Sequence, residues 1–77
     1  MPTGNQLRAA RSLIGLKQWQ LAEAAGIHPG VMNRMEKAGR GRVKGIKNLK
    51  AVMEALGDLG VEITETGVQL MPKKPKR

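Results

Sequence analysis

The chain has 77 residues, a formal net charge of +8 and a sequence pI near 10.7. This length suits one small domain, and the absence of cysteine excludes disulfides and thiolate metal sites. Aliphatic side chains and methionine have to form the core, because the chain has one Trp and no Phe or Tyr.

The chain offers no segment for insertion into a membrane. No apolar run approaches the roughly 18 residues that a membrane span needs. The first residues also lack the apolar segment of a signal peptide. We therefore expect a soluble, cytoplasmic protein.

The first predicted helix follows a short N-terminal arm, residues 1–4, which we expect to be frayed. Thr3 or Asn5 can cap this helix. Gly15 is expected to end it. Apolar residues recur in between at spacings of three and four: Leu7, Ala10, Leu13 and Ile14.

Residues 18–37 predict two short helices joined by a tight turn. Gly26 stops the first helix, because glycine readily adopts a positive φ. Pro29 suits the first position of the second helix, since its fixed φ is already helical. The apolar stripe of the pair comprises Leu21, Ala22, Ala25, Met32 and Met35.

The stretch LKQWQLAEAAGIHPGVMNRMEKA resembles the helix-turn-helix of the phage-repressor and Cro-like family, also called the xenobiotic-response-element type. The matching residues are Leu16, Gln18, Leu21, Ala22, Ala25, Gly26, Ile27, Met32, Met35 and Glu36. The resemblance extends over roughly residues 5–56. It implies a mainly α, repressor-like domain of about four to five helices, in which the helix starting near Pro29 reads the major groove of DNA.

The resemblance also implies roles for polar residues within the helices. In the family, an Arg at the position of Arg11 often pairs with the Glu that matches Glu36, which implies a structural ion pair. A Gln at the position of Gln18 braces a phosphate, and a helix N-terminus favours an anion as well. The alternatives are an exposed Arg11 and a plain surface glutamine.

Two residues depart from the family pattern. Trp19 stands where an acidic or polar residue is usual, and we expect it at the edge of the core rather than in an interface. His28 replaces the usual Ser or Thr cap of the next helix. Its expected roles are capping or a phosphate contact, because no metal-ligand or catalytic partner accompanies it in the sequence.

Base contacts are expected from the helix that starts near Pro29. Family members often hydrogen-bond to bases at the positions of Pro29 and Gly30, which here can offer only close apolar approach, for example to a thymine methyl. Hydrogen-bond readout is then expected from Asn33, suited to adenine, and from Arg34, suited to guanine. The alternative for Asn33 and Arg34 is phosphate contact without base reading.

Seven of the Lys and Arg residues lie between Arg34 and Lys50, where Glu36 is the one acid. Such a cluster suggests a polyanionic partner, although a solvated surface can have the same composition. Two of its arginines lie in a glycine-flanked loop that suits phosphate binding. The expected phosphate contacts are Gln18, His28, Lys37, Arg40, Arg42 and Lys44.

The C-terminal third predicts a fourth helix over 43–56, which can extend by one turn to Leu59, and then a β-hairpin. The segments 61–64 and 67–70 alternate apolar and polar residues around a Glu-Thr-Gly turn. An isolated hairpin is marginal in water, so it has to pack on the helices or pair with another chain. We expect dimerisation through Val61, Ile63, Val68 and Leu70. The segment 72–77 is expected to be a disordered basic arm for DNA.

The expected organisation is a DNA-binding domain over 1–60, a dimerising hairpin over 61–71 and a basic tail over 72–77. The expected function is that of a homodimeric, sequence-specific transcriptional repressor bound to a palindromic operator in double-stranded DNA. No cofactor, metal, small-molecule ligand or enzymatic activity is indicated. The alternative is a protein-interaction module, antiactivator- or antitoxin-like, on the same scaffold with little DNA specificity.

Overall fold

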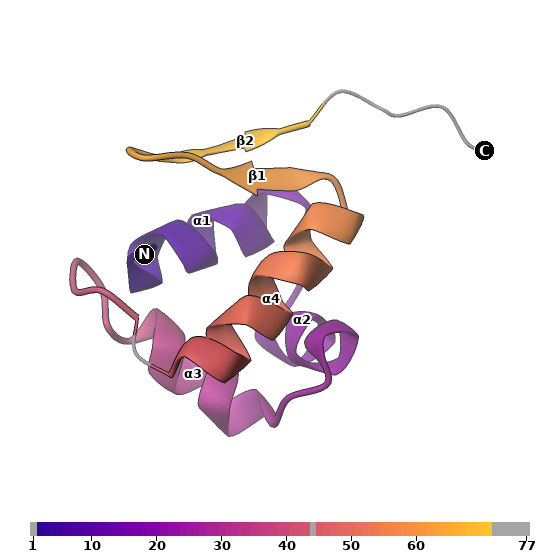
Figure 1. Cartoon of the computed structure of the whole chain (residues 1–77). Coiled ribbons are helices and arrows are strands. Elements are labelled where there is room, and N and C mark those ends of the chain that lie inside the picture. The colour runs from indigo at the N-terminus through magenta and orange to yellow at the C-terminus, as the bar shows by residue number, and fades with distance from the viewer. Residues whose placement is uncertain (1, 44, 72–77) are drawn as a thin grey trace.

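The computed structural model describes residues 2–43 and 45–71, and its fold is mainly helical (Figure 1). The predictions for Lys44 and for the tail 72–77 lie outside these residues. The helices are α1 (Gly4–Leu13), α2 (Gln18–Ala25), α3 (Pro29–Glu36) and α4 (Ile46–Asp58), and the strands are β1 (Val61–Ile63) and β2 (Val68–Leu70). The helical class and the hairpin agree with the sequence prediction, and within the described ranges there are four helices rather than five.

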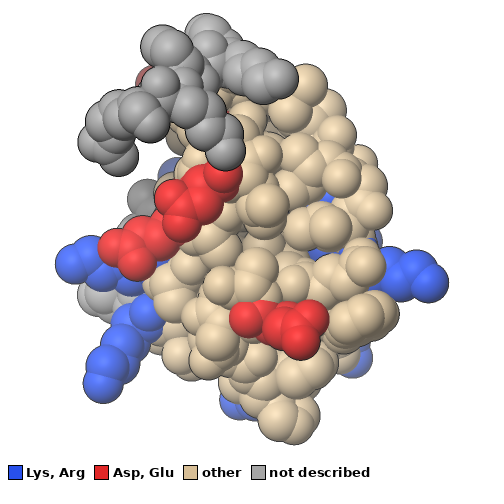
Figure 2. Space-filling model, turned by 90° about the vertical axis from the view of Figure 1, so that its right-hand side faces the viewer, with Lys and Arg blue, Asp and Glu red and all other residues tan. Residues whose placement is uncertain are grey.

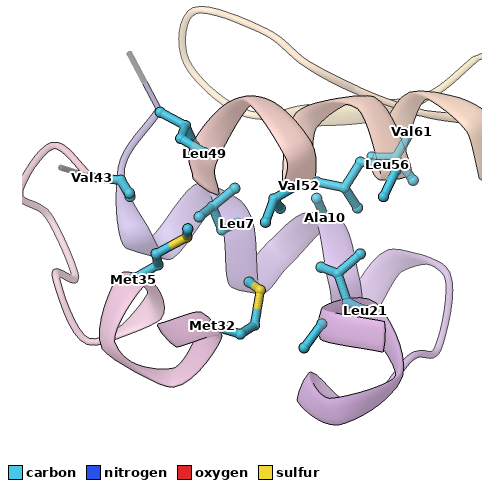
Figure 3. Close-up of a cluster of buried hydrophobic side chains, with 12 residues drawn as sticks. Leu7, Ala10, Leu21, Met32, Met35, Val43, Leu49, Val52, Leu56 and Val61 are labelled. Carbon is cyan, nitrogen blue, oxygen red and sulfur yellow. The ribbon is translucent and has the colours of Figure 1, made fainter. Parts of the chain in front are cut away.

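The elements lie in tiers, with the hairpin above α1 and with α2 and α3 below it, while α4 runs past all of them (Figure 1). Figure 3 shows side chains from the four helices converging on one core. No helix among the described residues is long and apolar enough to cross a membrane. The buried hydrophobic residues are Leu7, Ala10, Leu21, Ala22, Met32, Met35, Val43, Leu49, Val52, Ala55, Leu56 and Val61.

Helix α1 begins with a reciprocal capping box between Thr3 and Gln6. The Thr3 hydroxyl accepts from the Gln6 backbone N–H at 3.1 Å, and the Gln6 side-chain oxygen accepts from the Thr3 N–H at 2.9 Å. The Gln6 amide nitrogen then donates to the carbonyls of Thr64 at 2.8 Å and Gly67 at 3.2 Å. Thr3 rather than Asn5 is therefore the cap, and Gln6 also fixes the hairpin turn over α1.

The prediction of a frayed arm is wrong for residues 2–4. Pro2 accepts from the Val43 N–H at 3.1 Å, Thr3 forms a β-bridge with Arg42, and Gly4 donates to Gly41 at 3.3 Å. The physical reason is that the first N–H groups of a helix need acceptors outside the helix. The loop after α3 provides those acceptors, so the N-terminal segment is held against it.

Helix α4 begins three residues later than predicted, at Ile46 instead of Val43. The N–H of the buried Val43 donates to the Pro2 carbonyl, and Gly45 has a φ of 85°, so the helix starts only after these positions. The helix runs to Asp58, two residues past the predicted end. Leu59 then forms the C-cap, so the extension beyond Leu56 that the sequence allowed is present.

The hairpin packs on its own chain, which corrects most of the predicted dimerisation contacts. Val61 pairs with Leu70 and Ile63 with Val68, so all four side chains share one face of the sheet. That face lies on α1 and α4: Val61 is 2% exposed, and Ile63 and Val68 pack against the core. Leu70, 58% exposed, is the member of the set that remains available to another chain.

The prediction that Trp19 lies at the edge of the core is wrong. Trp19 is 54% exposed and is absent from the residues that pack against the core. Leu21 and Ala22, on the inner side of α2, are completely buried. Since successive helical residues are separated by about 100°, Trp19 lies to one side of that stripe.

The close packing of Gly4 leads to a stability prediction. A Cβ at Gly4 would lie 2.6 Å from the carbonyl oxygens of Met35 and Glu36 and 2.7 Å from the Gly39 nitrogen, all of them backbone atoms. Gly4→Ala should therefore lower the free energy of unfolding by about 1–3 kcal/mol, because α1 has to move away from the end of α3. Urea unfolding followed by circular dichroism measures this change.

Gly57 provides the matched control for this substitution. It lies inside α4 with no atom within 4 Å of an added Cβ. Gly57→Ala should raise stability by about 0.5–1 kcal/mol, because alanine restricts the unfolded chain and favours the helix. Equal effects of the two substitutions would contradict the proposed close contact at Gly4.

Candidate functional site

Helices α2 and α3 form a compact pair joined by a short turn. Gly26 has a φ of 71°, and its N–H donates to the carbonyls of Ala22 and Glu23. Ile27 also donates to Ala22, at 2.9 Å, which closes the end of α2. These bonds satisfy the helix terminus. The turn predicted from Gly26 is thus confirmed, and it sets the direction in which α3 leaves.

His28 caps α3, which was one of the two roles predicted for it. Its Nδ1 accepts from the Gly30 backbone N–H at 2.9 Å, and Pro29 follows as the first helical residue. A Cβ at Gly30 would lie 3.0 Å from that Nδ1. A side chain at position 30 would therefore press on the capping imidazole, which gives the absence of a polar group there a structural reason.

The outer side of α3 is exposed along the whole helix. Met32, Met35 and Glu36 are buried, whereas Pro29, Gly30, Arg34 and the C-cap Lys37 are exposed. Three of the four predicted base-contact residues therefore share one open surface. Asn33 is half-buried at the side of this surface.

The loop between α3 and α4 adds two exposed arginines, Arg40 and Arg42, to this surface. It is fixed to α1, because the Asn5 N–H donates to Gly39 at 2.8 Å and the Gly4 N–H donates to Gly41. In Figure 1 the loop accordingly lies beside the start of α1. The cationic groups therefore sit on a loop whose backbone is held in place.

Arg34 and Arg42 border the same hollow beside α3. It has a volume of about 260 Å³, and Met35, Ala38 and Val43 complete its lining. A hollow lined by two arginines together with apolar side chains suits an anion that carries an apolar portion. A sugar-phosphate unit has this chemistry.

An ion pair holds α3 to α1, which confirms the pairing of Arg11 with Glu36. Arg11 Nε lies 2.7 Å from Glu36 Oε2, and its second guanidinium nitrogen lies 3.0 Å from Oε1. A third nitrogen donates to the Leu16 carbonyl at 2.8 Å. The pair is bidentate and largely enclosed, with side-chain exposures of 16% for Arg11 and 3% for Glu36.

Gln18 takes part in this network from the first position of α2. Its side-chain nitrogen donates to Glu36 Oε1 at 2.9 Å, and the residue is half-buried. A contact between Gln18 and a phosphate would have to use its second amide N–H. The other described candidates for phosphate contact are exposed on or beside α3: His28, Lys37, Arg40 and Arg42.

Lys47 and Lys50 are two further basic residues near this surface that were not predicted as phosphate contacts. Both are exposed in the first half of α4, which begins at the end of the basic loop. The concentration of positive charge between Arg34 and Lys50 was the signal that pointed to them.

Gly4 and Gln6, which position the basic loop and the hairpin, were also not assigned a role. Nothing in the sequence near Gly4 distinguishes it from the other glycines of the chain.

Within the described ranges, no group of three or more His, Cys, Asp or Glu side chains is arranged to hold a metal ion. A scan against protein-family models found no match, and a search of curated proteins found no significant similarity.

The Arg11–Glu36 pair leads to a second stability prediction. Glu36→Ala should lower the free energy of unfolding by about 3–5 kcal/mol, because it leaves the Arg11 charge enclosed without its partner. Arg11→Met removes the other charge, and the double variant removes both. In urea unfolding the double variant should lose less stability than the two single losses added together, since neither charge remains unpaired. Additive losses would mean that the two groups do not interact.

Proposed function

We propose that this protein is a sequence-specific DNA-binding regulator of transcription, of the helix-turn-helix type, with α3 in the major groove. One observation carries the proposal. Exposed cationic residues lie on the outer side of α3 and on the adjoining loop, and the buried residues of α3 lie on the opposite side of the helix. Arg34 from α3 and Arg42 from the loop line the same hollow. We call this surface the basic face and define it by Arg34, Lys37, Arg40 and Arg42.

The dimensions of α3 support this proposal. A helix with its side chains is about 10–12 Å wide, and the major groove is about 12 Å wide. Small residues at the start of α3, Pro29 and Gly30, allow that end to approach the base edges closely. The larger Arg34 and Lys37 then lie further along the same side of the helix.

Within the basic face, the loop and α3 are proposed to make different kinds of contact with DNA. Phosphate contacts position a protein on the duplex, and base contacts provide specificity. Arg40 and Arg42 lie on a backbone that α1 holds in place. The loop backbone therefore loses little conformational entropy when it binds a partner. These two arginines are the proposed backbone contacts, while Arg34 is the proposed base contact at the edge of the shared hollow.

A second candidate function is a protein-interaction module on the same scaffold. The observation that favours it is the absence of a polar side chain at Pro29 and Gly30, the exposed start of α3. Such a module would bind a partner protein and would have little preference among DNA sequences.

Footprinting on the DNA that flanks the gene of this protein tests the proposed function. We expect protection of a defined site, with an affinity that decreases steeply as salt increases. The log–log slope should change by about −0.9 for each phosphate contacted. Uniform weak binding to all sequences, or no binding, would instead favour the protein-interaction module.

Arg34 provides the third prediction. Arg34→Ala should weaken binding to the natural site by about 1–3 kcal/mol if the guanidinium contacts one guanine in a bidentate manner. The loss should decrease on a site altered at that base pair, because the wild-type contact is already missing there. Titrations of the natural site and of single-base variants at fixed salt measure both effects.

Lys37→Ala is the matched control, because it removes one positive charge from the same side of α3. It should weaken binding to all sites to a similar extent. If Arg34→Ala also has the same effect on every variant site, Arg34 is a phosphate contact and not a base contact.

A further inference from the structure

A second hollow is lined by Gln6 of α1, Arg42 of the loop after α3 and Glu65 of the hairpin turn. Its volume is about 360 Å³, which falls within the range of roughly 300–1,000 Å³ that is usual for small-molecule sites. In Figure 1 the hairpin turn, the start of α1 and the loop follow one another down the left-hand side of the molecule. The lining of the second hollow is completed by Pro2, Met53, Ile63 and Thr64.

Hydrogen bonds hold the walls of the second hollow in place. The Gln6 side-chain nitrogen donates to the Thr64 carbonyl at 2.8 Å and to the Gly67 carbonyl at 3.2 Å, which fixes the hairpin turn to α1. The buried Pro2 accepts from the Val43 N–H at 3.1 Å, which ties the N-terminal segment to the loop. The hollow is therefore largely pre-formed, and a ligand has little backbone to order when it binds.

One part of the lining is apolar. Pro2 is buried, and Met53 and Ile63 are half-buried. Met53 and Ile63 also pack against the hydrophobic core, so their positions are set by the fold. An aliphatic group of a ligand that lies against these side chains removes apolar surface from water. The flexible methionine can adapt to the shape of such a group.

The polar part of the lining has groups of opposite charge. Arg42 provides guanidinium N–H donors and Glu65 provides carboxylate oxygens, and both residues are exposed. Because a guanidinium has several N–H donors, Arg42 can bind a carboxylate in addition to its contacts within the protein. The Thr64 hydroxyl accepts from the Gly67 N–H at 2.9 Å, which leaves its own O–H able to donate. The second hollow thus combines donors for a carboxylate, an acceptor for an ammonium group and an apolar surface.

We propose that the second hollow binds a free α-amino acid with an aliphatic side chain, and that the bound amino acid weakens the binding of DNA. The α-carboxylate binds Arg42 and the Thr64 hydroxyl, and the α-ammonium group binds Glu65. The aliphatic side chain lies against Met53 and Ile63. A ligand with negative charge alone would be repelled by Glu65, whereas a free amino acid has both charged groups on one carbon atom.

The charge distribution directs a carboxylate to this side of the molecule. Figure 2 views the right-hand side of Figure 1, away from the loop, and shows a broad uncharged area with acidic side chains on it and Lys and Arg near its margins. On the loop itself, Arg40 and Arg42 are both exposed. A carboxylate is therefore attracted to the loop and to the hollow beside it, rather than to the side that Figure 2 shows.

Arg42 connects the second hollow to the proposed DNA surface. It lines this hollow and also the hollow beside α3 that it shares with Arg34. A carboxylate on the Arg42 guanidinium competes with the DNA phosphate that the same group is proposed to contact. The effect on DNA rests on the proposed function, whereas binding of the amino acid is measured without DNA, so the two can fail separately.

An NMR titration of the full, isotope-labelled chain with L-leucine tests the second hollow directly. The amide signals of Thr64 and Glu65 should shift at millimolar leucine, while the indole signal of Trp19, which does not line the hollow, should stay in place. Isocaproate lacks the ammonium group of leucine, and isoamylamine lacks its carboxylate. Each should bind roughly tenfold more weakly than leucine, because each loses one charged contact.

Glu65→Gln removes the acceptor for the ammonium group at an exposed position of the hairpin turn. It should weaken the binding of L-leucine by roughly tenfold, and it should not weaken the binding of isocaproate, which has no ammonium group. Glu54→Gln is the matched control, because it makes the same change of charge at an exposed residue next to Met53 that does not line the hollow. This variant should bind leucine as the wild-type protein does.

The binding outcomes decide whether the second hollow is an amino-acid site. Leucine binding that is weakened by Glu65→Gln and retained by Glu54→Gln supports the proposal. Unchanged Thr64 and Glu65 signals at millimolar leucine overturn it. Equal binding of leucine and isocaproate also overturns it, because the ammonium group is then not recognised.

The effect on DNA is measured at the site that footprinting defines. Saturating L-leucine should raise the Kd for this site by roughly fivefold or more, for the wild-type protein and for Glu54→Gln. At the same leucine concentration the increase should be smaller for Glu65→Gln. Leucine that binds and leaves the Kd unchanged overturns the competition at Arg42. A protein that binds no DNA contradicts the proposed function alone, because the NMR titration still decides whether the hollow binds leucine.

Discussion

The position of α3 depends on one carboxylate, that of Glu36. Arg11 from α1 and Gln18 from α2 both donate to it, and Arg11 also binds the carbonyl that precedes α2, so three helices meet at this point. An enclosed charge of this kind is tolerated because Arg11 has the opposite charge and both carboxylate oxygens accept hydrogen bonds. The side of α3 opposite Glu36 is consequently fixed as the exposed side, and the basic face follows from that orientation.

A second constraint acts at the start of α1. Gly4 lies so close to the last turn of α3 that an added Cβ would meet three backbone atoms, and the first N–H groups of α1 use the carbonyls of the following loop. The Gln6 side-chain amide likewise connects α1 to the hairpin turn, through hydrogen bonds to the Thr64 and Gly67 carbonyls. Because α1 holds both the loop and the hairpin, the loop arginines of the basic face lie on a backbone that is anchored to the rest of the fold.

The sequence predicted those features whose cause is local. The end of α2 was predicted from Gly26, and the start of α3 from His28 and Pro29. The two strands were predicted from the period-two alternation. Each of these features depends on a few neighbouring residues. The Arg11–Glu36 pair came from the family resemblance. The ordering of residues 2–4, the close approach at Gly4 and the exposure of Trp19 could not be predicted, since each depends on a segment distant along the chain. The alternation predicted the two strands of the hairpin, but whether their apolar residues met α1 or another chain was not encoded in that period.

The charge pattern of α4 runs against the dipole of the helix. A helix is stabilised by acids near its N-terminus and bases near its C-terminus, through its dipole. α4 has the reverse order: Lys47 and Lys50 lie in its first half, and Glu54 and Asp58 lie in its second half. This order costs some helix stability, yet it places the lysines in the half of α4 that follows the basic loop and the acids in the half that is far from it. Departures from local preference of this kind are expected where function sets the sequence, and here the departure keeps positive charge next to the proposed DNA surface.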